Sequence, residues 1–230
     1  MSFLSENIKQ VPVMGHLLVF IKRSLFSKPS PVHGTGNSIN NKGVLNNVTY
    51  DIIGDYNEIV IGANTCLNDT LIFIRGNHHK LIIGESCFMG KGEIWMEDDH
   101  GSLIIHNHTT IEHAHLAVTE SHSSLEIHKD CMIAKQVEIR TGDSHSIIDM
   151  ETGKRINYAA NVILNEHVWV GAHAKILKGV TIGNNTVIAT GAIVTSDIPP
   201  YSIAAGIPAR VIKTNTDWKR DRIIDRSIGS

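Results

Sequence analysis

Apolar residues recur at every sixth position in the C-terminal part of the chain, and this period constrains the fold more than any other feature. The first set consists of large apolar residues: Leu164, Val170, Ile176, Ile182, Ile188 and Val194. The second set follows four residues after each of these and is smaller or β-branched: Val168, Ala174, Val180, Thr186, Ala192 and Ile198. A helix would repeat its apolar face at three and four residues, so the period excludes it. It predicts an all-β solenoid with three six-residue units in each coil.

A longer period continues this pattern toward the N-terminus. Large residues lie 22 positions apart: Ile61, Ile83, Ile105 and Ile127. We expect the coils to continue there with longer corners. The small inward position, four residues further on, holds Cys87, Thr109 and Cys131. Packing therefore explains two of the three cysteines, and an odd number without C-x-x-C spacing favours a reducing, cytoplasmic setting over disulfides or structural zinc.

Polar residues and glycines are expected at the corners of the coils. Gly171, Gly183, Asn165, Asn184 and Asn185 are of the types that accept the positive φ such corners can require. Most of the fourteen histidines are interpreted as solvated corner residues, including His78, His79, His106, His108, His122 and His128. A single histidine is therefore weak evidence for a functional site.

The ends of a solenoid need caps, because each coil contacts only its neighbours. We assign residues 1–36 to an N-terminal cap or membrane-interface segment, 37–212 to the solenoid with an inserted loop at 142–160, and 213–230 to a tail. The tail, with Trp218 among charged residues, is predicted to form a short helix. Residues 11–26 are too short an apolar run to span a membrane. Packing or a trimer contact is favoured there over weak binding to the inner face of the membrane.

The charge balance and the glycine pattern exclude several function classes. The sequence has 21 basic and 23 acidic residues, so it carries no basic excess for binding nucleic acid. Neither a Walker nor a Rossmann glycine pattern is present. Nucleotide chemistry of those kinds is therefore not expected.

Residues 162–213 resemble bacterial hexapeptide acyltransferases, through HVWVGAHAKILKGVTIG and PPYSIAAGIPARVIK. The preceding KDCMIAKQVEIRTGDSHSIIDMETGKRIN is similar to the polysaccharide O-acetyltransferase branch, which includes capsule polysialic acid O-acetyltransferases. The resemblance implies a left-handed parallel β-helix, a homotrimer, acetyl-CoA as co-substrate and active sites in clefts between neighbouring β-helices. Periodicity alone does not choose this hand, which runs against the usual rule for parallel strands.

The inserted loop contains the candidate catalytic residues. Asp143 and His145 match the family's D-x-H element, and the resemblance implies that His145 is the general base. A neutral imidazole suits the removal of a hydroxyl proton near pH 7. Asp143 is expected either to orient this imidazole or to cap backbone N–H groups of the loop. No serine or cysteine lies in a recognisable nucleophile context, which favours direct transfer.

The remaining candidate residues concern coenzyme A. Trp169 precedes the inward Val170 and so points outward; the family places it beside the thioester and acceptor, and trimer packing is the alternative. The family resemblance implies that small residues line the coenzyme A groove, at Ala172, Thr190 and Thr195. It implies that cations bind the phosphates, at Arg210 and Lys213, with Lys178 as a weaker addition. Solvated charge is the alternative for the cations.

These observations predict acetyl-CoA-dependent O-acetylation of a sugar hydroxyl on a capsular or other cell-surface polysaccharide, without a metal. The alternatives are N-acetylation of a nucleotide-linked amino sugar, a zinc hydratase of the γ-carbonic anhydrase kind using His113 and His115, and a non-catalytic scaffold. Candidate acceptor contacts are Lys154, Arg155 and Asn157 in the insertion, together with outward residues Glu93, Trp95 and Glu97.

Overall fold

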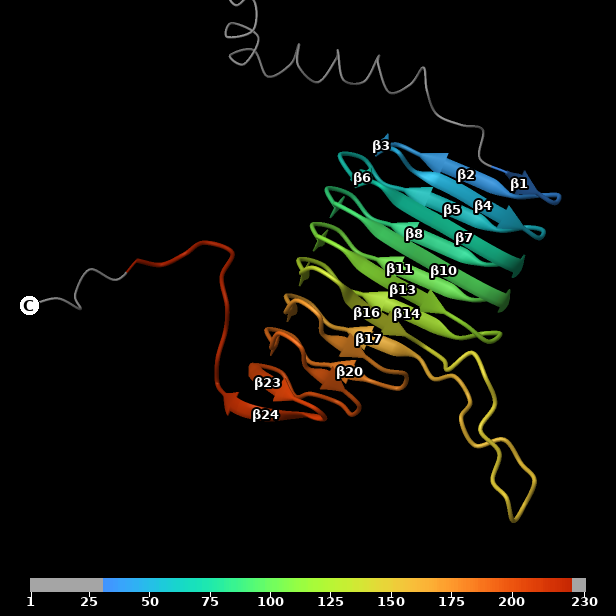
Figure 1. Ribbon diagram of the computed structural model, residues 1–230. Helices are drawn as coiled ribbons and strands as arrows, with labels where there is room; N and C mark the ends of the chain where they lie inside the picture. Colours follow the sequence, from blue (N-terminus) through green and yellow to red (C-terminus); the bar gives the residue numbers. More distant parts are fainter. Residues whose placement is uncertain (1–30, 225–230) are drawn as a thin grey trace, which may run out of the picture.

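The chain winds into a parallel β-helix of about seven turns (Figure 1). The structure, a computed structural model, describes residues 31–224. Each turn contributes one strand to each of three sheets, which we call A, B and C. The predicted solenoid is confirmed. Residues 1–30 lie outside the described part, and with them most of the segment expected to form the N-terminal cap or membrane contact.

The strands of each sheet stack in chain order along the solenoid. Sheet A consists of β1 (Val32–His33), β4 (Thr49–Ile53), β7 (Thr70–Asn77), β10 (Gly92–Asp99), β13 (Ala114–Val118), β16 (Val137–Arg140), β19 (Lys175–Ile176) and β22 (Ile193–Val194). Sheet B consists of β2 (Ser38–Asn41), β5 (Glu58–Ile61), β8 (Lys80–Ile83), β11 (Ser102–Ile105), β14 (Ser124–Ile127), β17 (Val162–Leu164) and β20 (Thr181–Ile182). Sheet C consists of β3 (Val44–Asn46), β6 (Cys66–Asn68), β9 (Phe88–Met89), β12 (Thr110–Ile111), β15 (Met132–Ile133), β18 (Trp169–Val170), β21 (Val187–Ile188), β23 (Ser202–Gly206) and β24 (Ala209–Thr214).

Three kinds of corner join the sheets, and they position the candidate site. The AB corner is the set of turns that lead from a strand of sheet A to a strand of sheet B, and the BC and CA corners are defined in the same way. The last two strands, β23 and β24, pair antiparallel across a tight turn. This hairpin closes the C-terminal end of the ladder, and strand β1 already begins within the segment expected to be a cap.

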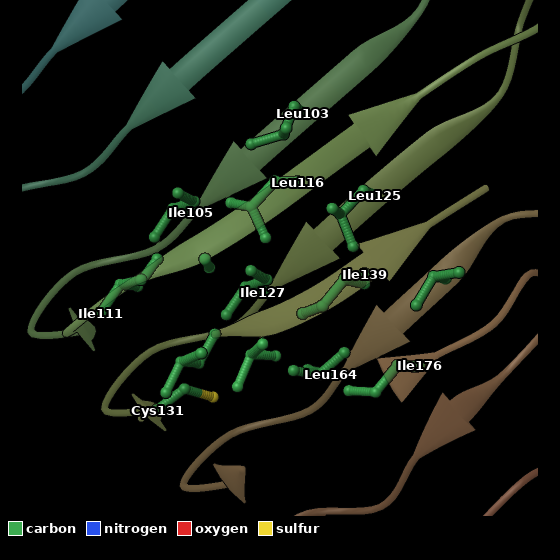
Figure 2. Close-up of a cluster of buried hydrophobic side chains, with 14 of the residues drawn as sticks. Leu103, Ile105, Ile111, Leu116, Leu125, Ile127, Cys131, Ile139, Leu164 and Ile176 are labelled. Atoms are coloured by element: carbon green, nitrogen blue, oxygen red, sulfur yellow. The ribbon is translucent and has the colours of Figure 1, made fainter. Parts of the chain in front are cut away.

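The core is formed by the two predicted sets of inward residues. Ile61, Ile83, Ile105, Ile127 and Leu164 lie in register on neighbouring strands of sheet B, and all are buried. Figure 2 shows several of these side chains pointing into the space between the sheets. Burying each large apolar side chain contributes about 1.5–3 kcal/mol. A ladder of such residues therefore supplies much of the stability of a fold that has no other core.

The buried cysteines belong to this core, as the 22-residue period predicts. Cys131 is completely buried, and its Sγ lies 3.2 Å from the carbonyl oxygen of Asn165. Burial raises the pKa of its thiol to about 12. Burial also raises the pKa of the Cys87 thiol. Both thiols are neutral at physiological pH, so neither is an activated nucleophile.

The glycines at the corners are needed for a reason other than the one expected. Asn185 has the predicted positive φ, at 58°, but Gly171 and Gly183 do not. A Cβ at Gly171 would lie 2.6 Å from the backbone nitrogen of Thr190, and one at Gly183 would lie 2.3 Å from that of Pro200. The close approach of the next coil therefore excludes a side chain at these two positions.

Two further expectations are wrong. His79 is not a solvated corner residue: it is 1% exposed, its Nδ1 accepts from the Gly101 amide at 3.1 Å, and burial lowers its pKa. The tail is not helical in its described part, because residues 215–224 run as an irregular segment back along the coils (Figure 1). Residues 31–224 contain no helix that is long and apolar enough to cross a membrane.

Candidate active site

The inserted loop leaves the solenoid at the AB corner, between β16 and β17, and projects away from the coils (Figure 1). An antiparallel bridge pairs Ile148 with Arg155. The Ile156 amide donates to the Ile147 carbonyl at 2.9 Å, and the Asp149 amide donates to Lys154 at 2.9 Å. The loop is therefore a hairpin with a defined shape rather than an irregular excursion.

Asn157 holds the base of this hairpin. It is 7% exposed, and its side-chain oxygen accepts the Ile147 amide at 2.7 Å. Its side-chain nitrogen donates to the His145 carbonyl at 2.8 Å and to Asp143 Oδ2 at 2.9 Å. Arg155 donates from Nε to the Asn157 side chain at 3.1 Å, and both of its terminal nitrogens donate to the Glu120 carboxylate. Arg155 and Asn157, expected as acceptor contacts, thus form the frame of the loop.

A lysine from the next coil fixes the loop from the other side. Lys178 forms an ion pair with Asp143 and also donates to the Asn157 carbonyl at 2.8 Å. The hydrogen bond from Lys178, together with that from Asn157, lowers the pKa of Asp143 below its usual value. Because the pKa of Asp143 is lower in the folded protein, the contacts of its carboxylate contribute fully to folding stability at neutral pH. This stabilisation is lost only as the pH falls through the lowered pKa.

His145 lies between these anchors with its side chain exposed. The Asn157 side chain binds its carbonyl, and its amide donates to the Asp143 carbonyl. The Asp143 carboxylate contacts Lys178 and Asn157, and its expected roles at the imidazole or at backbone amides stay predictions. The frame thus fixes the main chain of His145 and leaves the imidazole accessible.

We expect Asn157→Ala to loosen the hairpin without unfolding the solenoid. The substitution removes the hydrogen bonds that join Ile147, His145 and Asp143, and because these partners are exposed or partly exposed, each lost bond should cost about 0.5–1.5 kcal/mol. Amide hydrogen exchange should increase in residues 143–157 and stay unchanged in sheets A to C, with a similar melting temperature. Uniformly faster exchange throughout the β-helix would show that Asn157 supports the whole fold instead.

Trp169 lies on a different part of the coil, at the start of β18 in sheet C. It points outward from β18 in one ladder with Thr110, Met132 and Val187. Its side chain is 37% exposed, and part of its surface faces the indole of Trp218, whose ring centroid is 6.0 Å away. The exposed position expected from the repeat is confirmed, and the tail supplies part of its cover.

Residues 215–224, which we call the strap, cross the BC corner. Trp218 is 5% exposed, stacks on the His167 ring at 4.1 Å between centroids, and donates from Nε1 to the His167 carbonyl at 2.8 Å. Arg220 donates to Asp130 Oδ1 at 3.0 Å and to Thr110 Oγ1 at 2.9 Å. These polar and aromatic contacts join the strap to three successive coils.

Both ring nitrogens of His167 face hydrogen-bond acceptors. Nδ1 lies 2.6 Å from Asp130 Oδ2, and Nε2 lies 3.0 Å from the Trp218 carbonyl oxygen. A carboxylate and a carbonyl only accept, so the imidazole satisfies both contacts at once only when it is protonated. Burial alone would lower the pKa of His167, but the hydrogen bonds to Trp218 and Asp130 and the charge of Asp130 raise it above its usual 6.5.

The docking of the strap should therefore weaken at alkaline pH. Because the pKa of His167 is raised in the folded protein, its contribution to folding stability is fully present below the unfolded pKa of 6.5. This stabilisation is lost as the pH rises through the folded pKa. Asp130, Asp217 and Arg220 surround the ring and stay charged over this range. We expect Trp218 fluorescence to change with a midpoint above pH 6.5 in wild type and to lack this transition in His167→Gln. The same transition in both proteins would contradict the assignment.

The candidate coenzyme A residues lie at three places on the chain. Ala172 and Thr190 lie one above the other at the CA corner, where the Gly191 amide donates to the Ala172 carbonyl at 2.8 Å. Arg210 pairs with Ala205 at the same end of β23. Lys178 and Thr195 lie at the AB corner, and Lys213 pairs with Ile203 at the far end of the terminal hairpin. A single chain therefore brings together only Ala172, Thr190 and Arg210.

The histidines considered for a zinc site do not converge within this chain. His115 points outward on sheet A with Nδ1 3.1 Å from Glu93 Oε2, and His113 precedes the same strand. Within residues 31–224, the group of three ligand-type side chains that approach one another within 4.8 Å is His106, Glu126 and His128. That group lies beside the BC corner and includes neither His113 nor His115.

Comparisons with known proteins agree with this architecture. The family model "Bacterial transferase hexapeptide (six repeats)" matches residues 161–196. The solved structure of the polysialic acid O-acetyltransferase OatWY superposes with a TM-score of 0.79 at 29% identity, covering 85% of this chain and 93% of that one. The polySia-specific acetyltransferase NeuO superposes with a TM-score of 0.76 at 34% identity, covering 84% and 89%.

Curated relatives align over shorter segments. The polysialic acid O-acetyltransferase of Escherichia coli O1:K1 / APEC is 43% identical over 91 residues, which are 40% of this chain and 30% of that protein. The galactoside O-acetyltransferase of Escherichia coli strain K12 is 50% identical over 60 residues, 26% of this chain and 30% of that protein. The repeat matched at residues 161–196 and the two superpositions define the class as hexapeptide transferases. The chain belongs to the hexapeptide-repeat acetyltransferase family.

Proposed function

We propose that the protein transfers an acetyl group from acetyl-CoA to a hydroxyl of a cell-surface saccharide, with His145 as the general base. The observation that carries the proposal is the frame of Asp143, Asn157 and Lys178, which fixes the main chain beside an exposed imidazole. Such fixing is what general base catalysis requires, because the base must stay within hydrogen-bond reach of the proton it removes.

In the proposed reaction, the imidazole of His145 takes the proton of the acceptor hydroxyl while the oxygen attacks the thioester carbonyl. The C–S bond breaks, the new ester bond forms, and the imidazolium returns the proton to the leaving thiolate. No covalent enzyme intermediate is needed, which agrees with the burial of Cys87 and Cys131. The names of the relatives support oxygen, rather than nitrogen, as the acceptor atom.

The active unit that we propose is a trimer, and the outer face of sheet B supports it. Val60, Ile82 and Ile104 point outward there on consecutive strands, and Ile163 follows beyond Glu126 in the same ladder; the four aliphatic side chains are only partly covered. A ladder of aliphatic residues on an outer face is typical of a surface that another protein covers. We assign sheet B to the three-fold axis, so that copies of this chain cover one another.

The proposed axis determines which corners of neighbouring chains lie next to each other. When three triangular coils place sheet B toward a common axis, the AB corner of one chain lies beside the BC corner of the next. The inserted loop would thus approach Trp169 of its neighbour. Apolar residues on the loop would also be covered, and among these Met150 is 92% exposed and Tyr158 and Ile156 are each 62% exposed in the single chain.

This arrangement would place the coenzyme A residues on two walls of one cleft. One chain would contribute His145, Lys178 and Thr195 from its AB corner. The next would contribute its sheet C, with Trp169 and Lys213 at the BC edge and Ala172, Thr190 and Arg210 at the CA edge, so that the coenzyme would lie across this sheet. The separation of Lys178 and Thr195 from the other candidates, which a single chain does not explain, is what a shared cleft requires.

An acceptor panel tests the proposed reaction. Purified protein with acetyl-CoA is offered oligosialic acid, a galactoside and a nucleotide-linked amino sugar, and coenzyme A release is measured together with the mass of the product. We expect an alkali-labile ester on a saccharide hydroxyl, with a product about 42 Da heavier than the acceptor because an acetyl group replaces a hydrogen atom. An alkali-stable amide on the amino sugar, or no transfer to any acceptor despite acetyl-CoA binding, would contradict the proposal.

A further inference from the structure

A groove lies between the strap and the BC corner, beyond the candidate active site. Its volume is about 580 Å³, and its lining consists of Ser86, His108, Thr110, Lys129, Asp130, Glu166 and Arg220. Every one of these side chains is polar or charged. We propose that this groove binds a sugar unit of the acceptor chain, next to the unit that is acetylated; the inference rests on the proposed function.

The position of the groove connects it to the site of transfer. Thr110 lies in the same outward ladder of sheet C as Trp169, with Met132 between them. Strands in a sheet are about 4.8 Å apart, so two steps of this ladder cover roughly 10 Å. The strap spans the same interval, since Trp218 faces Trp169 and Arg220 contacts Thr110. One or two sugar units fit this separation.

The chemistry of the lining matches a ligand rich in hydroxyl groups. Donors are supplied by Lys129 and Arg220, and acceptors by Glu166 and Asp130, with hydroxyls of Ser86 and Thr110 able to do both. The charges are balanced in pairs: Lys129 Nζ lies 3.1 Å from Glu166 Oε1, and Arg220 lies 2.9 Å from Asp130 Oδ1. A sugar hydroxyl both donates and accepts, so paired charges of both signs suit it better than an excess of one sign.

The strap gives the groove a fixed wall. Arg220 donates to Asp130, to Thr110 and, at 3.1 Å, to the carbonyl of Cys131. Its guanidinium also lies 5.6 Å from the Trp218 ring. A side chain with these contacts is held in one orientation before ligand arrives, which reduces the entropy lost on binding.

Direct binding tests the groove independently of catalysis. The variant Lys129→Ala/Glu166→Ala removes the exposed pair, whose loss should affect folding little. Lys175→Ala/Glu138→Ala is the matched control, because these residues form a similar pair at 2.8 Å on sheet A. Binding of oligosialic acid and of a neutral galacto-oligosaccharide is measured by calorimetry in full-length wild type and both variants, without acetyl-CoA.

We expect wild type to bind at least one of the two oligosaccharides, and the groove variant to bind it about tenfold more weakly through the loss of hydrogen bonds to charged groups. The control variant and the affinity for acetyl-CoA should be unchanged. Failure of wild type to bind either oligosaccharide, or equal weakening in both variants, overturns the proposal. If a saccharide binds through the groove but no acetyl transfer occurs in the acceptor panel, the proposed reaction is contradicted. The assignment of the groove as a saccharide site would then still stand.

Discussion

His145→Ala should lower kcat by about 10² or more while the affinity for acetyl-CoA and the assembly stay nearly unchanged. The group acts on the proton that moves in the transition state, and its exposed side chain contributes little to folding.

His78→Ala is the control for this experiment, because His78 is an exposed histidine on the same AB corner but far from the loop. It should behave as wild type. Near-normal turnover by His145→Ala with an identified acceptor would show that the base lies elsewhere, and His113 or His115 would become the next residue to replace. Trp169→Ala should differ from both, because a ring that lines the cleft affects binding as well as positioning.

Ile82→Asp/Ile104→Asp should convert the trimer into monomers and reduce activity by about 10² or more. Carboxylates on the outer face of sheet B would have to be buried without partners at the proposed axis, which costs far more than the aliphatic contact contributes. Separating the chains also removes His145 from the neighbouring Trp169, and small displacements of reacting groups already cost about 10² in rate. Light scattering gives the mass, and circular dichroism shows whether the β-helix persists.

Ile53→Asp is the matched control for the interface, since Ile53 is an isoleucine that points outward from sheet A with 49% exposure. This variant should remain trimeric and active. If the sheet B variant stayed a fully active trimer, another face of the solenoid would form the axis. If it became an active monomer, the shared cleft itself would be wrong.

The repeat alone predicted the solenoid and the core because a coil buries its side chains locally, at positions that the period counts directly. Leu164, Val170 and Ile176 are buried as that period predicts. The hand of the helix and the residues of the site came instead from family resemblance, because neither changes the spacing of apolar residues. Spacing also misjudged Gly171 and Gly183, whose role depends on how closely the next coil approaches.

The frame of the loop and the strap were missed because their contacts join residues far apart in the chain. Lys178 and Asp143 meet because the chain, after the insertion, winds once more around the solenoid and returns to the AB corner beside the loop. Trp218 carried one usable signal, a lone tryptophan in a charged tail, which favours a docked ring over a solvated helix. His167 gave none, because its partners Asp130 and Trp218 are neighbours only in three dimensions.

Mixed trimers test the shared active site most directly. His145→Ala and Trp169→Ala chains carrying different tags are produced together, and only trimers that contain both are purified. In a cyclic trimer with either composition, one cleft receives an intact loop and an intact tryptophan, so we predict activity of about one third of wild type. Each variant alone should remain nearly inactive. Mixed trimers as inactive as the single variants would show that each chain holds a complete site, and would contradict the account.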